Sequence, residues 1–528
     1  MSHTSVTSVP NPLSSLLFSA ESVRAIDRYV IEEKGVPGFE LMQKAAAAAF
    51  HQLSRHWPEV GPLLVLCGGG NNGGDGYLVA AAARRHGKQV RCVAVKNPGD
   101  LKGDAARAHD KALADGVVVE RWHDLDETGC QTLFDKTGLI VDAMLGTGVK
   151  GAPREPFSTV IEAASQSRCP VLAVDIPSGL DATTGVTAGK ALRAEVTVTF
   201  IALKSGLFLG QGPESAGRVE FESLNLGIEK VADTGQTPIA RRFDWAGLSN
   251  TLPRRPVTAH KGRFGHLLVI AGDHGFGGAG ILTAEASARC GTGLTSLATR
   301  AEFVAPALTR CPALMVHAVN HGEDLPDLIE KADILVCGPG LGRKAWGQQM
   351  LQKVLASGKP RVLDADAINL LAEAEQVPGK TAQQVVTPHP GEAARLLGCS
   401  VPDIESDRLA AAQSIQEKFG GVVLLKGAGT VVADGDGYPW VLEGGNPGMA
   451  TGGMGDALTG MIGGLAAQGM SLPVATRMAA ALHLASANAA SGHLGHRGLL
   501  PMDVIEGMPR LMARAEGFAG QLTQKGDG

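Results

Sequence analysis

Short apolar runs alternate with longer amphipathic segments along the first half of the chain. The runs have the length of buried strands, and the segments between them are long enough for crossover helices. The candidate strands are Leu63–Cys67, Gln89–Val95, Leu139–Leu145, Val171–Ile176, Glu195–Ala202 and Val219–Leu224, and the candidate crossover helices include Tyr77–His86 and Phe157–Ser167. Two further helices, Ser19–Lys34 and Phe39–Leu53, are expected before the first strand, with Ser19 as an N-cap. This rhythm predicts an α/β fold with a Rossmann-like, doubly wound parallel sheet.

A second α/β series follows a polar, proline-containing stretch between about Gly227 and Lys261. Its candidate strands lie in Gly265–Gly272, Asp333–Cys337, Arg361–Asp364, Gln384–Thr387 and Gly421–Lys426. A chain of 528 residues also exceeds the usual size of a single core. We therefore predict two α/β domains, residues 1–235 and 236–528, joined near the polar stretch.

Composition restricts the partners and the compartment. The formal net charge of −5 leaves no basic footprint for nucleic acid. The eight cysteines show no C-x-x-C spacing and lie mostly in apolar runs, as expected of small core residues in a reducing compartment. The first residues lack the regions of a secretory signal, and no apolar run approaches the roughly 18–20 residues that span a bilayer. We expect a soluble cytoplasmic protein with neither nucleic-acid nor membrane partners.

Three polar loops follow candidate strands of the first half. They are Gly70-Asn-Asn-Gly-Gly-Asp-Gly76, Asp142-Ala-Met-Leu-Gly-Thr-Gly148 and Asp175-Ile-Pro-Ser-Gly-Leu180. Because the carboxyl ends of strands in an open α/β sheet surround the ligand crevice, these loops are expected to converge on one site. Gly68–Gly73 also satisfies G-x-G-x-x-G, but Lys96 follows the second strand in place of a ribose-binding acid, which disfavours a plain NAD dehydrogenase. A glycine turn without a ligand is the alternative.

The three loops resemble those of the NAD(P)H-hydrate epimerase family, over roughly residues 15–230. That family interconverts the R and S forms of hydrated NADH and NADPH. The resemblance implies that Asp175 is the acid/base residue and that Asn72, Asp142 and Ser178 hold a potassium ion. It places the hydrate against Asn71, Asn72, Gly73, Gly74, Asp75, Gly146, Thr147, Gly148, Val149, Lys150, Gly151 and Ala152. From the residues alone, Asp142 and Asp175 are also compatible with structural turn acids.

A glycine loop opens an apolar helix near the end of the chain, with the sequence Asn446-Pro-Gly-Met-Ala-Thr-Gly-Gly-Met-Gly-Asp456. Its backbone N–H groups and the helix dipole suit a phosphoryl group, and Asp456 is placed where a general base is useful. A tight turn followed by a helix-stabilising acid is the alternative. Gly379-Lys-Thr381 fails as a P-loop because Ala374 occupies the position of the required glycine, and no H-E-x-x-H or cysteine cluster favours a transition metal.

This loop, with Gly272–Gly280, Cys337–Gly342, Thr387–Glu392 and Lys426–Thr430, resembles the NAD(P)H-hydrate dehydratase family across residues 240–515, which implies a ribokinase-like α/β domain. In that family Asp456 would remove the hydrate's hydroxyl proton as a nucleotide phosphoryl group is transferred to the oxygen, with Gly452 and Gly453 as the anion hole. The resemblance places Gly280, Gly340 and His389 against the hydrate, and Lys426, Gly427, Ala428, Gly429, Thr430 and Gly455 against the nucleotide. From the residues alone, Lys426 fits a solvated strand-end lysine and His389 a satisfied loop histidine.

Together the two resemblances imply a bifunctional repair enzyme for the NADH and NADPH hydrates, NADHX and NADPHX. The first domain equilibrates the epimers, and the second dehydrates the S epimer with a nucleotide and Mg²⁺. ADP is expected from the fused architecture alone, since the motifs do not distinguish ADP from ATP. One alternative is a ribokinase-like small-molecule kinase fused to a nucleotide-binding regulatory domain, and another is a non-enzymatic binding module in the first half. A homo-oligomer is also expected.

Overall fold

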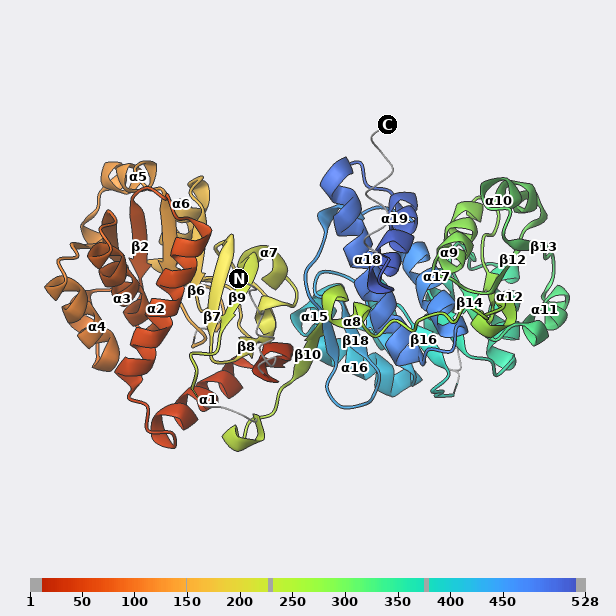
Figure 1. Ribbon diagram of the computed structural model, residues 1–528, viewed down its shortest axis with the longest axis horizontal. Helices are drawn as coiled ribbons and strands as arrows, with labels where there is room; N and C mark the ends of the chain where they lie inside the picture. Colours follow the sequence, from red (N-terminus) through yellow and green to blue (C-terminus); the bar gives the residue numbers. More distant parts are fainter. Residues whose placement is uncertain (1–11, 149, 227–230, 375–378, 519–528) are drawn as a thin grey trace. The chain divides into compact units, whose positions relative to one another are not determined.

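The computed structural model describes residues 12–148, 150–226, 231–374 and 379–518 and divides the chain into two compact units, Met1–Arg241 and Arg242–Gly528 (Figure 1). Each unit has its own sheet and its own apolar core. Among the described residues, no helix combines the length and the apolar character needed to cross a membrane.

The first unit is built on a parallel sheet with the strand order β4-β3-β2-β5-β6-β7-β9. The strands are β2 (Leu63–Cys67), β3 (Val90–Ala94), β4 (Val119–Arg121), β5 (Leu139–Ala143), β6 (Val171–Val174), β7 (Val196–Phe200) and β9 (Arg218–Glu222). The chain moves outward from β2 in one direction and then returns to β5 on the other side. This reversal confirms the predicted doubly wound sheet, and it opens a crevice at the carboxyl ends of β2 and β5.

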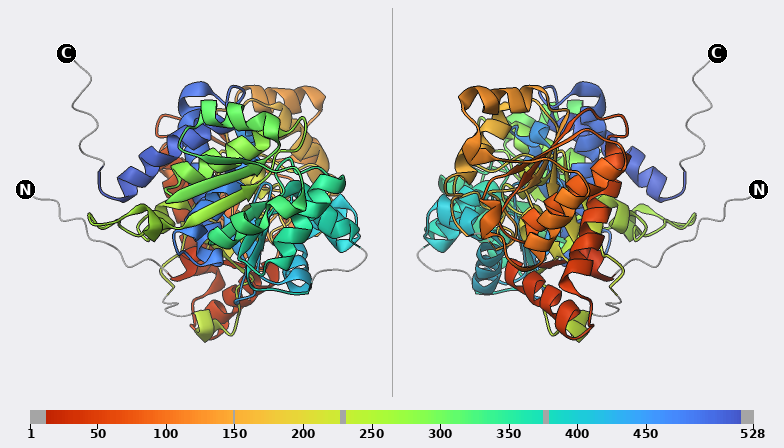
Figure 2. Two further views of the ribbon diagram at one scale, coloured as in Figure 1. Left: turned by 90° about the vertical axis from the view of Figure 1, so that its right-hand side faces the viewer. Right: turned by 90° about the vertical axis from the view of Figure 1, so that its left-hand side faces the viewer.

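Helices cover both faces of this sheet. Leu63, Val65 and Cys67 of β2 share one apolar cluster with helices α1 to α4, whereas Leu64 and Leu66 share another with α5 and α6. The helices are α1 (Ala20–Glu32), α2 (Gly38–His56), α3 (Asn71–Arg85), α4 (Gly103–Ala114), α5 (Glu127–Asp135), α6 (Phe157–Gln166) and α7 (Gly212–Ala216), as labelled in Figure 1. Figure 2, right, shows red and orange helices of this unit facing the viewer. Two short strands, β1 (Leu16–Phe18) and β8 (Leu203–Lys204), pair in parallel beside them. Ser19 caps α1 as predicted, since its side chain accepts from the Ser22 N–H at 3.1 Å.

Helix α3 begins at Asn71, earlier than the predicted start at Tyr77. The expected glycine loop is therefore the first turn of the helix. A Cβ at Gly73 would lie 2.1 Å from the Gly68 carbonyl oxygen, and one at Gly74 would lie 2.6 Å from Met42 Sδ. These glycines allow the helix to start against its own strand and against α2.

The second unit has a sheet whose order runs β13-β12-β11-β14-β15-β16-β17-β18-β19. Pairing is parallel as far as β17, and β18 and β19 continue it in antiparallel fashion. The strands are β11 (His266–Ile270), β12 (Leu294–Thr299), β13 (Met315–Ala318), β14 (Ile334–Cys337), β15 (Arg361–Leu363), β16 (Gln384–Val386), β17 (Val422–Leu425), β18 (Val431–Ala433) and β19 (Trp440–Leu442). A further strand, β10 (Ala240–Phe243), contains the division between the units.

Both faces of the second sheet are buried. Leu267 and Val269 of β11 share a core with α9, α17, α18 and α19, and the alternate residues Leu268 and Ile270 are also fully buried. The helices are α8 (Trp245–Ser249), α9 (Gly277–Arg289), α10 (Val304–Arg310), α11 (Pro326–Lys331), α12 (Ala345–Ala356), α13 (Ala365–Glu373), α14 (Pro390–Leu397), α15 (Val401–Ser406), α16 (Arg408–Phe419), α17 (Met454–Ala467), α18 (Leu472–Leu494) and α19 (Pro501–Ala515). The unit is thus a layered α/β domain.

Candidate active sites of the two units

The first unit holds a cavity of about 780 Å³. Of the residues predicted to bind the hydrate, Asn71, Asn72, Asp75, Gly146, Thr147 and Gly148 line it, and so does Asp175. Gly73 and Gly74 are instead packed inside the start of α3. Lys150, Gly151 and Ala152 are not part of the cavity wall, and Val149 lies outside the described residues.

Asp175 follows β6 with a φ of 69°, a left-handed conformation that a non-glycine residue rarely adopts. Its carboxylate accepts a short hydrogen bond from Lys204 Nζ and a longer one of 3.4 Å from Thr199 Oγ1. Lys204 is only 1% exposed, and it also donates to Thr199 Oγ1 at 3.1 Å and to the Phe200 carbonyl at 3.0 Å. All three protons of the ammonium are thereby used, and Asp175 is held as a paired carboxylate at the cavity wall.

Asp142 lies at the end of β5 and is fully buried. Its two oxygens accept from Ser178 Oγ at 2.6 Å and from the Ser178 N–H at 2.7 Å, and Leu145 N donates to the same hydroxyl at 2.9 Å. Asn72 Nδ2 donates to the Leu145 carbonyl at 3.0 Å, which leaves its buried Oδ1 without a hydrogen-bond partner. Burial raises the pKa of Asp142 to about 6, against the opposing hydrogen bonds from Ser178.

These three side chains fit a monovalent cation. They offer a buried carboxylate, a hydroxyl oxygen and an amide oxygen that lacks a partner, and hard cations prefer oxygen ligands of this kind. The residues predicted for potassium are therefore brought together by the fold through the backbone of Leu145.

Two further carboxyl groups face the same cavity. Asp27 of α1 lines it, and its buried Oδ1 accepts no hydrogen bond. Burial raises the pKa of Asp27 to about 6, with Lys204 acting against this and Asp175 adding to it. For Asp75, burial raises the pKa well above its usual range, and the negative charges of Asp175 and Asp27 add to this.

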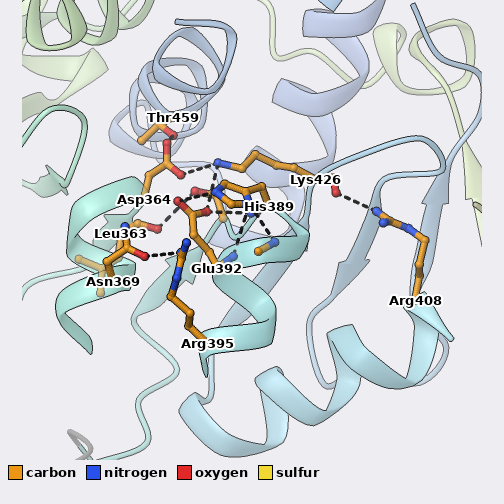
Figure 3. A network of polar contacts seen from close by, with 11 residues as sticks. Leu363, Asp364, Asn369, His389, Glu392, Arg395, Arg408, Lys426 and Thr459 are labelled. Carbon is orange, nitrogen blue, oxygen red and sulfur yellow. Dashed lines mark hydrogen bonds and ion pairs between the residues drawn. The ribbon is translucent and has the colours of Figure 1, made fainter. Parts of the chain in front are cut away.

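In the second unit, Asp364 and Lys426 form a buried ion pair after β15 and β17, with Nζ 2.7 Å from Oδ1 (Figure 3). The other Asp364 oxygen accepts from Thr459 Oγ1 of α17 at 2.8 Å, and Asp364 is 1% exposed. Burial lowers the pKa of Lys426, but the nearby negative charges, led by Asp364 and Glu392, outweigh this and the pKa is raised. Lys426 is therefore a charged group held in an ion pair and 20% exposed, which corrects the solvated strand-end alternative.

His389 is the N-cap of α14, where its Nδ1 accepts from Gly391 N at 2.9 Å. The backbone N–H of His389 donates to Glu392 Oε2 at 2.8 Å, which completes a capping box. The ring is half exposed, so His389 has both a structural role and a face open to solvent. Burial raises the pKa of Glu392 to about 7, although the charge of Lys426, 3.8 Å away, opposes this.

The glycine loop before α17 meets this ion pair. Gly453 is the N-cap of α17 with a φ of 91°, and a Cβ at Gly455 would lie 3.5 Å from Lys426 Nζ and 3.7 Å from Asp364 Oδ2. Asp456 lies in the first turn of the helix, as predicted for a base at a phosphoryl site. Burial and then the charge of Asp364 raise the pKa of Asp456 to about 6, with Lys426 opposing.

Arg408 binds the backbone of the predicted nucleotide loop. Its buried guanidinium donates to the carbonyls of Leu425 at 3.2 Å, Lys426 at 2.8 Å and Gly429 at 3.4 Å. Gly427 has a φ of 129°, and a Cβ there would lie 3.0 Å from Arg408 NH2. Within the loop, Thr430 Oγ1 donates to the Gly427 carbonyl at 2.9 Å. Ala428 lies between Gly427 and Gly429 in this loop and contributes a methyl side chain.

The two remaining residues predicted to face the hydrate are tightly packed glycines. Gly280 is buried in α9, where a Cβ would lie 3.3 Å from Leu297 Cδ1. Gly340 has a φ of 55°, and a Cβ there would lie 2.7 Å from Phe276 Cβ. Phe276 itself is 62% exposed, so Gly340 lets this loop approach an uncovered aromatic ring.

Sequence reasoning missed four polar residues of these sites: Lys204, Asp27, Asp364 and Arg408. Lys204 carried a usable signal, because it is the one charge in the apolar stretch Phe200–Phe208. Asp364 was predicted only as the last residue of the candidate strand Arg361–Asp364. Asp27 and Arg408 lie within ordinary amphipathic helices, and nothing in their immediate sequence marks them.

Fold and sites define a two-unit α/β enzyme, with carboxylates and a buried lysine at the carboxyl ends of parallel strands in each unit. The family described as YjeF-related protein N-terminus matches residues 38–206, and the family described as NAD(P)H-hydrate dehydratase matches residues 267–510. The chain belongs to the family of bifunctional NAD(P)H-hydrate repair enzymes, whose second domain is ribokinase-like.

Full-length relatives support this assignment. The bifunctional NAD(P)H-hydrate repair enzyme of Escherichia coli K12 is 43% identical over 505 residues, covering 95% of either chain. That of Coxiella burnetii is 41% identical over 491 residues, covering 93% of this chain and 98% of its own. Among solved structures, an ADP/ATP-dependent NAD(P)H-hydrate dehydratase from Bacillus subtilis, co-crystallized with ATP/Mg²⁺, is 29% identical with a TM-score of 0.46 and covers 52% of this chain and 98% of its own.

Proposed function

We propose that the chain repairs hydrated NADH and NADPH in two steps. The first unit interconverts the R and S epimers of the hydrate, and the second converts the S epimer back to the dihydronicotinamide with a nucleotide. The observation that carries this proposal is the presence, in one chain, of both matched families over units that each contain a polar site.

In the first unit, Asp175 is the proposed acid/base residue. Lys204 donates to its carboxylate and fixes its position, and Asp175 would accept a proton from the hydroxyl group of the hydrate. Epimerisation by ring opening and epimerisation by loss and return of water both need this step or its reverse. The cavity wall formed by Asn71, Asn72, Asp75 and Gly146–Gly148 supports binding of the hydrate beside Asp175.

Potassium is proposed as the cation of the first unit, held by Asn72, Asp142 and Ser178. The partnerless Asn72 oxygen and the buried Asp142 carboxylate support this. When bound, the ion supplies a fixed positive charge beside the cavity. Ser178 Oγ accepts from the Leu145 N–H, and Asn72 Nδ2 donates to the Leu145 carbonyl. These two side chains therefore orient the loop of Leu145.

In the second unit, Asp456 is proposed to take the hydroxyl proton while the terminal phosphoryl group of the nucleotide is transferred to the oxygen. The amides of Gly452, Gly453 and Gly455 and the ammonium of Lys426 would stabilise the transferred group. Phosphate then leaves as the ring nitrogen supplies its electron pair. Conversion of hydroxide into phosphate improves the leaving group, which explains the use of a kinase-like domain for dehydration.

Mg²⁺ is proposed to enter with the nucleotide phosphates. The described residues contain no group of three or more His, Cys, Asp or Glu side chains able to hold a metal by themselves. Coordination by phosphates with one or two carboxylates is the usual arrangement for this ion. ADP is proposed as the donor, with release of AMP and phosphate.

Recovery of dihydronicotinamide absorbance from an R/S mixture of NADPH hydrate tests the proposal, in the presence of potassium, Mg²⁺ and either ADP or ATP. Wild type should recover the full absorbance. Asp175→Asn should recover only the S half, and Asp456→Asn should recover none. Absence of recovery with both nucleotides, together with accumulation of a phosphorylated product from another small molecule, would favour the ribokinase-like kinase alternative.

A cytoplasmic location and a homo-oligomeric state complete the proposal. All eight cysteines are free thiols, which supports a reducing compartment. Light scattering of the purified chain measures the oligomeric state directly.

A further inference from the structure

Asp27 is a carboxyl group of the cavity that no hydrogen bond explains. It lies on α1, before the residues 38–206 that the first family matches. Its Oδ1 is buried and accepts no hydrogen bond, although the residue lines the cavity that contains Asp175. A buried oxygen of this kind costs stability unless a ligand or a proton satisfies it.

Among the described residues, no neighbouring cation donates to this oxygen. Lys204 donates its three protons to Asp175, Thr199 and the Phe200 carbonyl, so none is left for Asp27. Arg24, one helical turn before Asp27, donates to the Thr147 carbonyl at 2.6 Å. Asp233, on a turn that also packs against α1, is exposed to solvent. Asp27 therefore faces the cavity as an acid with no cation donating to its buried oxygen.

The other carboxyls of the cavity have different properties. Asp175 is paired with Lys204, whereas burial raises the pKa of Asp75 well above its usual range. Two carboxyls whose environments separate their protonation states are the usual arrangement of an acid and a base. Asp27 has a pKa raised to about 6, so it exchanges its proton closer to neutral pH than an ordinary carboxyl does.

We propose that Asp27 is the second proton-exchanging group of the epimerase site, acting as the acid when Asp175 acts as the base. The proposal rests on the function proposed above for Asp175. In ring opening, Asp175 takes the hydroxyl proton, the oxygen electron pair forms the carbonyl, and the carbon–nitrogen bond breaks. The bonding pair goes to the ring nitrogen, which takes the proton of Asp27. Ring closure on the other face returns both protons, so atoms and charge balance.

The same pair serves the other route. In loss of water, Asp27 gives its proton to the departing hydroxyl while the ring nitrogen supplies the electron pair for the carbon–nitrogen double bond. Water then adds to the other face and loses a proton to Asp175. Each route needs one proton donor and one proton acceptor. After the route through loss of water, Asp27 has lost a proton and Asp175 has gained one, and exchange with solvent restores both.

Asp27→Asn and Asp27→Glu in the full-length chain test this proposal, with Glu32→Gln as the matched control. Glu32 is an exposed acid on the same helix, and it does not line the cavity. We expect the kcat of epimerisation in Asp27→Asn to fall by about 100-fold or more with KM changed by less than about threefold. Asp27→Glu should recover at least about tenfold of this loss, and Glu32→Gln should match wild type.

The pH profile and the stability separate a chemical role from a structural one. Asp27 must be protonated to act, so the kcat/KM of wild type should fall as pH rises through about 6, and this limb should vanish in Asp27→Asn. A raised carboxyl pKa opposes folding above that pH, so Asp27→Asn should melt at a higher temperature than wild type at neutral pH, with the gain lost in acid.

An epimerisation rate within twofold of wild type in Asp27→Asn overturns the proposal, and so does a rise in KM with unchanged kcat. Loss of activity with a lower melting temperature and no recovery in Asp27→Glu also overturns it, because that result describes a packing residue. If wild type itself shows no epimerisation, the proposed function fails and not this inference alone. Dehydration of pure S epimer serves in every variant as the control for the second unit.

Discussion

Lys204 and Asp175 form an ion pair in which the lysine is almost fully buried and the aspartate has a left-handed backbone. The pair joins the short strand β8 to the carboxyl end of β6. Because the remaining protons of Lys204 bind Thr199 and the Phe200 carbonyl, the ammonium has one fixed position. The Asp175 side chain is consequently oriented before any ligand arrives.

Lys204→Met should therefore impair epimerisation without affecting the second unit. The Asp175 carboxylate would lose the ammonium that pairs with it and fixes its position in a partly buried place. We expect kcat/KM for epimerisation at neutral pH to fall by about 100-fold or more. Lys190→Met, which removes an exposed lysine paired only with Glu162, is the control. Equal activity in both variants would contradict the assigned role of Lys204.

Potassium should raise the thermal stability of the first unit. A cation that binds the native state alone stabilises it by mass action, about 2.7 kcal/mol at a hundredfold excess over Kd. The melting temperature should rise with potassium more than with choline at equal ionic strength. In Asp142→Asn this difference should disappear, whereas Asp110→Asn, which alters an exposed acid on α4, should retain it. An identical response to both salts in wild type would argue against the ion site.

Dehydration should depend on the ionisation of Asp456. Its pKa is raised to about 6, and a base must be ionised to act. The kcat/KM for dehydration of S hydrate should therefore decrease as pH falls through about 6 and be constant above it. Asp456→Asn should lose activity by about 1,000-fold or more, as expected for removal of a general base. Asp327→Asn, an exposed acid in the first turn of α11, should leave both the rate and the profile unchanged.

Arg408→Met should weaken nucleotide binding and destabilise the second unit. The carbonyls of Leu425, Lys426 and Gly429 would lose their shared donor, and unpaired buried groups cost about 1–3 kcal/mol each. We expect KM for the nucleotide to rise by about tenfold or more. Epimerisation should be unaffected. Lys353→Met, which breaks an outer pair with the exposed Glu323, offers a control in the same unit. An unchanged KM would show that the loop holds its shape without Arg408.

Gly73→Ala should damage the first unit much more than Gly70→Ala. The new methyl carbon would lie 2.1 Å from the rigid Gly68 carbonyl, whereas at Gly70 no atom lies within 4 Å. Overpacking against backbone typically costs about 1–3 kcal/mol. Gly74→Ala should be intermediate, because its neighbour is the flexible Met42 side chain. Chemical denaturation that follows the first unit gives this order, and equal midpoints for all three variants would refute the packing role.

Much of the fold could be predicted from the sequence because both sheets bury their strands on two faces. Leu63–Cys67 was predicted with its observed bounds, since a continuous apolar run of that length has few alternatives. The start of α3 was predicted wrongly, because glycines favour a turn unless close packing requires them in a helix. The strands β12, β13, β18 and β19 were not predicted, and the short β18 and β19 depend on pairing more than on pattern.

The candidate sites could be predicted where a loop carries its own motif. Asp142, Asp175 and Asp456 all follow strands or open helices in glycine-rich segments, and the structure places them there. Asp27 and Arg408 lie on helices, where one charge resembles any other in a single sequence. Lys204 stands out in its apolar stretch, but its contact with Asp175 becomes visible only when the chain is folded.

The two glycines at the start of α3 and the polar residues that flank them meet different structural requirements. Gly73 and Gly74 are fixed by the backbone of Gly68 and by Met42, so any protein that keeps this helix start must keep them, whatever it catalyses. Asn72 and Asp75 also line the cavity, so their side chains can meet a chemical requirement that glycine cannot. A genome search based on the glycines alone would therefore collect chains that share this backbone. The residues at positions 72 and 75 would have to be compared as well before an activity is proposed for any of them.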